Sequence, residues 1–133
     1  MLLVDTSAFY ARHDRRDAWH RTASRIWRDL EGTPLVTTNH VMEESLTLLA
    51  RRIGYRFAAD LARHVYPSIE LDVIYTTREE EQAALHFFSK FADQKIGFTD
   101  CISFAVMRRN GISTAFTFDS HFIDAGFKVI GLK

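Results

Sequence analysis

Short apolar runs alternate with amphipathic stretches along this chain, and the alternation predicts which segments are strands and which are helices. Runs at 1–4, 34–38, 113–118 and 127–130 have the continuous hydrophobicity of strands buried on both faces, and 69–76 is a further strand candidate. Between them, apolar residues recur at helical spacing in 17–30, 39–53, 55–66, 77–92 and 99–109. A short helical or loop segment is expected at 8–14.

The order of these elements predicts the architecture. Strands that alternate with helices indicate a mainly parallel sheet of four to five strands with helices on both faces, a three-layer α/β/α sandwich. The 133 residues suit a single domain that spans 1–133, and no repeat or linker interrupts it. In the 39–53 and 55–66 segments the two adjoining helices form a helical hairpin, a common surface for dimers and partner helices.

Two helices carry specific expectations about burial. One face of the 17–30 helix gathers Trp19, Ala23, Ile26, Trp27 and Leu30. This stripe predicts that both tryptophans belong to the core or to an interface and do not stack on bases. In the 77–92 helix, Thr77 and Glu80 form a capping box, and Leu85, Phe88 and Ala92 are expected on a buried line. The arginines between 12 and 28 fit a solvated helix face as well as a contact with RNA.

Composition narrows the setting of the protein. Hydrophobic residues make up 47% of the chain, and 17 basic residues balance 17 acidic ones, so the sequence is globular and not generally nucleic-acid-binding. Its single cysteine cannot form an intramolecular disulfide, which fits a reducing compartment. No stretch approaches the roughly 20 apolar residues of a membrane span. We expect a soluble, cytoplasmic protein that does not bind membranes.

Several carboxylates fall where parallel strands would bring them together. Asp5 and Asp119 each end an apolar strand, although each could simply cap the helix that follows. Asp100 begins a helix that is apolar nearly all round, where a carboxylate needs compensation. Glu43 and Glu44 flank the apolar stripe of the 39–53 helix on opposite sides, so periodicity cannot choose between them.

If the acids do converge, the charge must be neutralised. Two carboxylates about 4 Å apart repel by roughly 4 kcal/mol at an effective dielectric of 20. Sites made only of carboxylates suit hard cations such as Mg²⁺ or Mn²⁺. Such ions assist the hydrolysis of phosphodiester bonds, which predicts a metal-dependent nuclease.

Four segments together resemble the PIN-domain ribonucleases, and in particular the VapC-type toxins of toxin–antitoxin pairs. These segments are Val4–Ser7, Val41–Leu49, Phe98–Cys101 and Phe116–Phe122, with Gly126 and Phe127 after the last. The resemblance covers essentially the whole chain. It implies a PIN-like α/β/α fold and Mg²⁺- or Mn²⁺-dependent endonucleolytic cleavage of RNA. It also implies a homodimer that a cognate antitoxin silences.

The same resemblance assigns the site. Asp5, Glu44 and Asp100 would hold the metal, and Asp119 would position a second ion or a water; all four are the expected catalytic residues. Glu43 is the alternative to Glu44 if the register differs by one residue. Thr6 or Ser7, and Thr117, fall where the family often has hydroxyls that support the site.

Two other residues and two rival functions remain. Cys101 is expected to be a small buried hydrophobe. His121 is the histidine nearest the site, with a structural role in a loop favoured.

One rival function is that of a receiver-like signalling domain, which needs a phospho-accepting Asp on a middle strand and a Lys after the last strand pair; here Lys128 lies inside a strand. The other is a binding module in which the acids are only helix caps.

Overall fold

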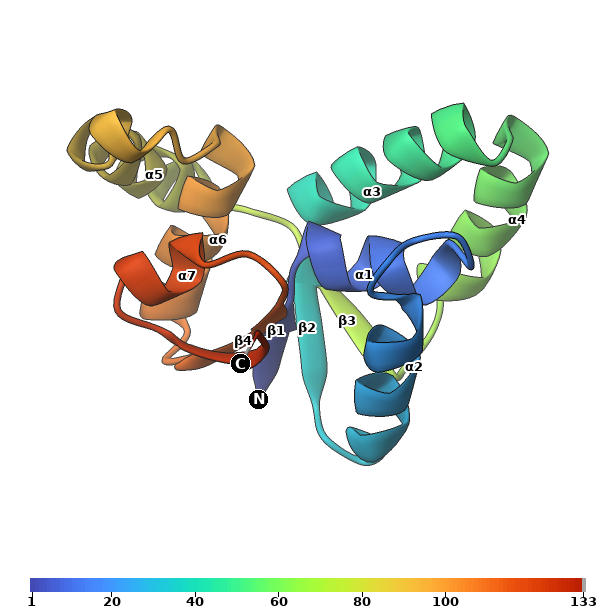
Figure 1. Cartoon of the computed structure of the whole chain (residues 1–133). Helices are drawn as coiled ribbons and strands as arrows, with labels where there is room; N and C mark the ends of the chain where they lie inside the picture. The colour runs from blue at the N-terminus through green and yellow to red at the C-terminus, as the bar shows by residue number, and fades with distance from the viewer. Residues whose placement is uncertain (133) are drawn as a thin grey trace.

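The sheet is fully parallel and places the first strand at its centre (Figure 1). The computed structural model describes residues 1–132. Within this range the strands are β1 (Leu2–Val4), β2 (Leu35–Thr38), β3 (Leu71–Ile74), β4 (Thr114–Thr117) and β5 (Lys128–Gly131). Their order is β3-β2-β1-β4-β5, and β1 pairs with β2 on one side and with β4 on the other. The prediction of a mainly parallel sheet of four to five strands is confirmed.

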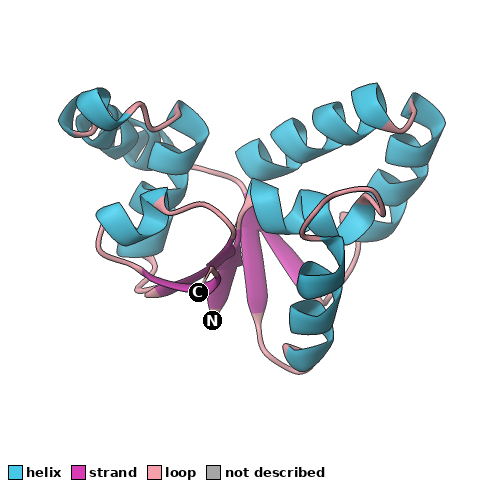
Figure 2. Ribbon diagram, in the orientation of Figure 1, coloured by secondary structure: helices cyan, strands magenta, loops and turns pink. Residues whose placement is uncertain are grey.

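Helices cover both faces of the sheet (Figure 2). One side carries α1 (Thr6–His13), α2 (His20–Asp29), α3 (Asn39–Arg52) and α4 (Tyr55–Val65). The other carries α5 (Arg78–Lys90), α6 (Phe98–Arg109) and α7 (His121–Asp124), with a short 3₁₀ turn, η1, at Ala92–Gln94. Gly54, whose φ of 150° suits glycine, separates α3 from α4. The predicted three-layer sandwich is confirmed.

Two cores lie on the two faces of the sheet, and β1 contributes to both. Leu2 and Val4 pack with α1, α3 and α4, whereas Leu3 packs with α5 and α6. Successive side chains of a strand point to opposite faces, so a fully apolar strand is what a central position requires. Leu3 and Val4 are both completely buried.

The burial expected for two helices is partly wrong. Trp19 lies before the first residue of α2 and is 45% exposed, because Asp17 turns the chain ahead of the helix. In α5 the buried residues are Glu80, Ala84 and Phe87, while Leu85 is 58% and Phe88 46% exposed. The predicted capping box between Thr77 and Glu80 is present and orients this helix.

The strand order also bears on the rival reading as a signalling domain. Receiver-like flavodoxin folds have the order 2-1-3-4-5, in which the third strand is central. Here β1 is central and β3 lies at the edge, so the topology does not support that rival. No helix among the described residues has the length and apolar character that crossing a membrane requires.

Candidate active site

A pocket of about 720 Å³ opens at the carboxyl ends of β1 and β4. Parallel strands present their carboxyl ends on one edge of a sheet, and ligands of open α/β folds bind there. The pocket is lined by all four predicted acids, which come from the ends of β1 and β4 and from α3 and α6: Asp5, Glu44, Asp100 and Asp119. The chain therefore brings together carboxylates from positions spread over most of its length.

Asp5 is the most buried of these acids, with 2% of its surface exposed. Its Oδ2 accepts hydrogen bonds from Thr117 Oγ1 at 2.7 Å and from Ser7 Oγ at 3.3 Å. Its Oδ1 is buried and finds no hydrogen-bond partner among the described residues. The pKa of Asp5 is raised to about 6, mainly by burial, and the charges of Asp119 and Glu44 contribute to the rise. The hydrogen bond from Thr117 acts in the opposite direction and lowers it.

Asp100, Asp119 and His121 form a compact group beside Asp5. The Nδ1 atom of His121 lies 3.2 Å from Asp100 Oδ2 and 3.1 Å from Asp119 Oδ1. Burial raises the pKa of Asp100 to about 7, and the charge of Asp5 contributes, whereas the hydrogen bond with His121 lowers it. His121 begins α7 and lines the pocket, so it belongs to the site itself rather than to a remote loop.

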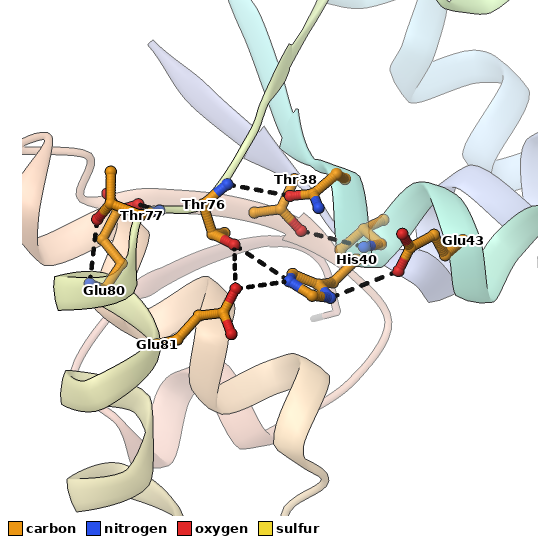
Figure 3. A network of polar contacts seen from close by, with 9 residues as sticks. Thr38, His40, Glu43, Thr76, Thr77, Glu80 and Glu81 are labelled. Atoms are coloured by element: carbon orange, nitrogen blue, oxygen red, sulfur yellow. Dashed lines mark hydrogen bonds and ion pairs between the residues drawn. The ribbon is translucent and has the colours of Figure 1, made fainter.

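The structure separates Glu44 from its neighbour Glu43. Glu44 lines the pocket with Asp5, whereas Glu43 Oε1 lies 3.5 Å from His40 Nδ1. On its other side, His40 Nε2 is 3.3 Å from Glu81 Oε2, which accepts a hydrogen bond from Thr76 (Figure 3). Glu43 is thus part of a polar link between α3 and α5. The structure thus places Glu44, the residue that the family resemblance implied, in the pocket with Asp5.

The simpler hypothesis, that the strand-end acids are only helix caps, fits one of them. In the described part of the chain, Asp5 precedes α1 but its side chain makes no capping hydrogen bond. Asp119 does accept the backbone N–H of His121 at 2.9 Å, near the start of α7. A cap therefore accounts for part of the role of Asp119 and for none of the burial of Asp5.

The donor set fits a divalent cation. Ligand atoms of Asp100, Asp119 and His121 all lie within 4.8 Å of one another, which is the spacing of a metal-binding group; Asp5 and Glu44 lie outside that group but line the same pocket. A buried carboxylate oxygen without a donor, Asp5 Oδ1, is costly unless a cation or proton satisfies it. Carboxylate oxygens suit Mg²⁺ and Mn²⁺, and an imidazole nitrogen suits Mn²⁺ better than Mg²⁺.

The supporting hydroxyls were predicted in part. Ser7 Oγ accepts the backbone N–H of Phe118 at 2.9 Å and lies 3.1 Å from Thr117 Oγ1, so both hydroxyls support Asp5. Thr6 Oγ1 is buried and makes no hydrogen bond within the described range. Cys101 is fully buried, as expected, and burial raises the pKa of its thiol to about 11.

Sequence reasoning missed one feature of the pocket, the position of Trp19. The side chain lines the pocket wall and stacks on Phe118. A signal was present: Asp17 stands two residues earlier, where an aspartate commonly bonds a backbone N–H and turns the chain. That bond forms here, from Trp19 N to Asp17 Oδ2 at 2.9 Å.

Comparisons with known proteins agree with this geometry. The family model described as "PIN domain" matches residues 2–128. The chain is 39% identical over 127 residues to "23S rRNA-specific endonuclease VapC20" of Mycobacterium tuberculosis, which covers 96% of this chain and 95% of the relative. It is 31% identical over 106 residues to "VapC ribonuclease" of Archaeoglobus fulgidus, covering 76% and 66% of the two chains.

Solved structures are similar as well. The crystal structure of M. tuberculosis VapC20, described as a "Sarcin-Ricin loop cleaving toxin", superposes with a TM-score of 0.89 at 37% identity and covers 96% of each chain. FitAcB from Neisseria gonorrhoeae has a TM-score of 0.74 at 14% identity, with 98% and 96% coverage, and supports the fold alone.

Proposed function

This chain belongs to the PIN domain family, and on that premise we propose that it is a metal-dependent endoribonuclease, the toxin of a toxin–antitoxin pair. One observation carries the proposal. Four carboxylates converge on a single pocket, and the most buried of them keeps an oxygen without a partner among the described residues. A fold without a ligand gains nothing from this arrangement, because the like charges repel and burial raises two of their pKa values.

The residues divide the work by position. Asp5, Glu44, Asp100 and Asp119 would hold Mg²⁺ or Mn²⁺, which when bound supplies charge neutralisation for the phosphate and activation of water. His121 holds Asp100 and Asp119 together, and a neutral imidazole there can serve as a further ligand. Thr117 and Ser7 donate to one oxygen of Asp5, which leaves the other free for the cation.

The substrate proposed is ribosomal RNA. The relative that is 39% identical along nearly the whole chain is named a 23S rRNA-specific endonuclease, and its structure is described as cleaving the sarcin–ricin loop. A stem-loop of this kind displays unpaired bases, which are the usual targets of specific RNA recognition. Action on the ribosome would place this protein in the cytoplasm.

Two protein partners follow from the same assignment: a cognate antitoxin and a second copy of the chain. Around the α3–α4 turn and along α4, large apolar side chains are exposed: Ile53 at 39%, Tyr55 at 73%, Phe57 at 40% and Tyr66 at 38%. Exposed large apolar side chains on adjoining elements are a feature of interaction surfaces. They support a partner-binding role for the helical hairpin.

The test is cleavage of purified ribosomes and of total RNA with Mg²⁺, with Mn²⁺ and with a chelator, followed by mapping of the cut ends. We expect discrete cuts that need the metal and vanish in Asp100→Asn. Asp72→Asn, which changes an exposed acid on β3, is the matched control and should cleave normally. Metal-independent cleavage, or equal cleavage by Asp100→Asn, would refute the proposal, and complete absence of cleavage would favour a binding module.

A further inference from the structure

Trp19 and Phe118 form an aromatic stack on the wall of the catalytic pocket. Their ring centroids are 4.8 Å apart and their planes differ by 12°, so the rings are nearly parallel. Both residues line the pocket that holds the four acids. Phe118 is half-buried, whereas Trp19 is 45% exposed. Phe118 therefore backs the indole, and a large part of the indole surface is open to solvent.

The chain holds Trp19 in place from both sides. Its backbone N–H donates to Asp17 Oδ2, and its carbonyl accepts the N–H of Ala23 at the start of α2. The loop before it is fixed by Asp14, whose carboxylate accepts hydrogen bonds from the Tyr10 hydroxyl and the Arg16 backbone. These bonds fix the backbone of Trp19, and the stack on Phe118 orients its ring, so the residue loses little conformational entropy when a ligand covers it.

Trp27 shows what a packing tryptophan looks like in the same chain. It is half-buried within the core and packs edge-on against Phe9 and at a tilt against Phe116. Trp19 belongs to neither core cluster of the described residues, and its stacking partner is the residue directly before Asp119. Core packing accounts for Trp27 and leaves the exposed indole of Trp19 unexplained.

The charge around the stack suits a nucleic acid. Arg52 lines the same pocket, and Arg15, Arg16 and Arg21, close to Trp19 in sequence, are exposed. Of these arginines, Arg52 is the one that lines the pocket, where it can contact a phosphate; Asp17 lines the pocket too, and Arg16 Nε lies 3.7 Å from Asp14 Oδ1.

We propose that Trp19, backed by Phe118, is the platform on which an unpaired base of the substrate RNA stacks beside the scissile phosphate. The inference rests on the proposed ribonuclease function and adds a determinant of where the RNA is cut. Phe118 and Asp119 are consecutive, with Cα atoms about 3.8 Å apart. The stack and the acids also line the same pocket, so in this proposal the base lies on the indole while the adjoining phosphate lies among the carboxylates. Stacking on an aromatic face tolerates all four bases, so it selects an unpaired nucleotide rather than a particular sequence.

The experiment is a double-mutant cycle between the tryptophan and the base. The probe is a hairpin RNA with the sarcin–ricin loop sequence, compared with versions that carry an abasic nucleotide at each position near the mapped cut. We expect Trp19→Leu to raise KM on intact RNA about tenfold, equivalent to about 1.4 kcal/mol, with a small change in kcat. At one abasic position the variant and the wild type should have the same KM. Trp19→Tyr, which keeps a stacking ring, should restore most of the affinity.

A second measurement separates this inference from the nuclease proposal. In a Trp27→Phe, Asp100→Asn background, Trp19 is the one remaining tryptophan and the RNA is not consumed. We expect the hairpin RNA to quench its fluorescence, and the abasic RNA to quench it less. An equal penalty of Trp19→Leu at every abasic position, or no quenching by bound RNA, would overturn the platform while leaving the nuclease proposal intact. Failure of the wild type to cleave any RNA would overturn the nuclease proposal instead.

Discussion

Replacing Asp5 with Asn should stabilise the metal-free protein even though it abolishes cleavage. The side chain keeps its shape, and the amide oxygen can still accept the hydrogen bond from Thr117. What disappears is a negative charge in a nearly inaccessible position beside other acids. In the absence of metal this charge destabilises the folded state, so its removal should increase the free energy of unfolding.

The magnitude follows from the pKa of Asp5, which burial raises from 3.8 to about 6. A rise of about two units corresponds to roughly 3 kcal/mol of destabilisation when the carboxyl is ionised. The buried amide N–H₂ of Asn lacks an acceptor where Asp5 Oδ1 has no donor, which costs about 1–2 kcal/mol. A net gain of about 1–2 kcal/mol remains, and for a chain of this length that is about 4–7 °C in Tm.

The pH dependence of this gain has a definite sign. Because the folded-state pKa of Asp5 is raised, the wild type loses stability as the pH rises from about 4 to about 6, and the loss is complete above that range. The difference in Tm between Asp5→Asn and the wild type should therefore be largest at pH 8 and close to zero at pH 5. Near pH 3 it should reverse in sign, because the cost of the unpaired amide then remains without any gain from the lost charge.

Thermal melts in chelator at pH 5 and pH 8 provide the assay, with Asp72→Asn as the exposed-acid control. Added Mn²⁺ at 100 times its Kd should stabilise the wild type by about 2.7 kcal/mol and so raise its Tm. The Tm of Asp5→Asn should stay nearly unchanged. A lower Tm for Asp5→Asn in chelator at pH 8, or a difference that does not vary with pH, would refute the reasoning. Asp5 would then be a structural acceptor for Thr117 and Ser7.

Four further substitutions test the site and its surroundings. Glu44→Gln should lower kcat by at least a hundredfold, since a site carboxylate contributes charge stabilisation worth several kcal/mol. Glu43→Gln should keep kcat within about threefold of the wild type. Equal losses of kcat in steady-state cleavage assays would contradict the choice of Glu44. Thr117→Val removes a hydrogen bond that lowers the pKa of Asp5. In denaturant titrations we expect it to destabilise the fold by about 1–3 kcal/mol at pH 8 and by less at pH 5. The same loss at both pH values would mean that Thr117 does not stabilise the ionised form of Asp5. Gly131→Ala places a Cβ 2.4 Å from the Thr117 carbonyl oxygen, at a backbone φ of +116°. The same titration should show a loss of about 2 kcal/mol or more in the free energy of unfolding. No loss would mean that β5 can shift away from Thr117 without cost.

The fold was predictable because its main determinants are local. Apolar runs such as Leu2–Val4 and their spacing by helical segments identify a parallel sheet. The structure shortens the first four strands and shifts the last one by a residue. The third strand, expected at 69–76, extends only over Leu71–Ile74, because pairing with β2 ends at Thr38. Where pairing stops is a property of two segments and is not encoded in either one.

The positions of two acids were predictable because each lies at the end of a strand: Asp5 follows β1 directly, and Asp119 comes two residues after the end of β4. The choice between Glu43 and Glu44 needed the orientation of α3, which the bond between His40 and Glu81 helps to set across 41 residues. Trp19 was misjudged because helical spacing was extended through Asp17, whose side chain turns the chain before α2 begins. The catalytic roles of Asp5, Glu44, Asp100 and Asp119 remain predictions.

The pairing of β1 with β4 has a consequence for how this protein is made. Asp5 and Thr117 are 112 residues apart and share a hydrogen bond at the heart of the pocket. At 5–20 residues per second, a ribosome needs about 6–22 seconds to synthesise the chain between them. Until β4 emerges and pairs with β1, the nascent polypeptide lacks Thr117 and Asp119, so the pocket is incomplete although Asp5, Glu44 and Asp100 have already been synthesised. The pocket can therefore form only when nearly the whole chain has been synthesised.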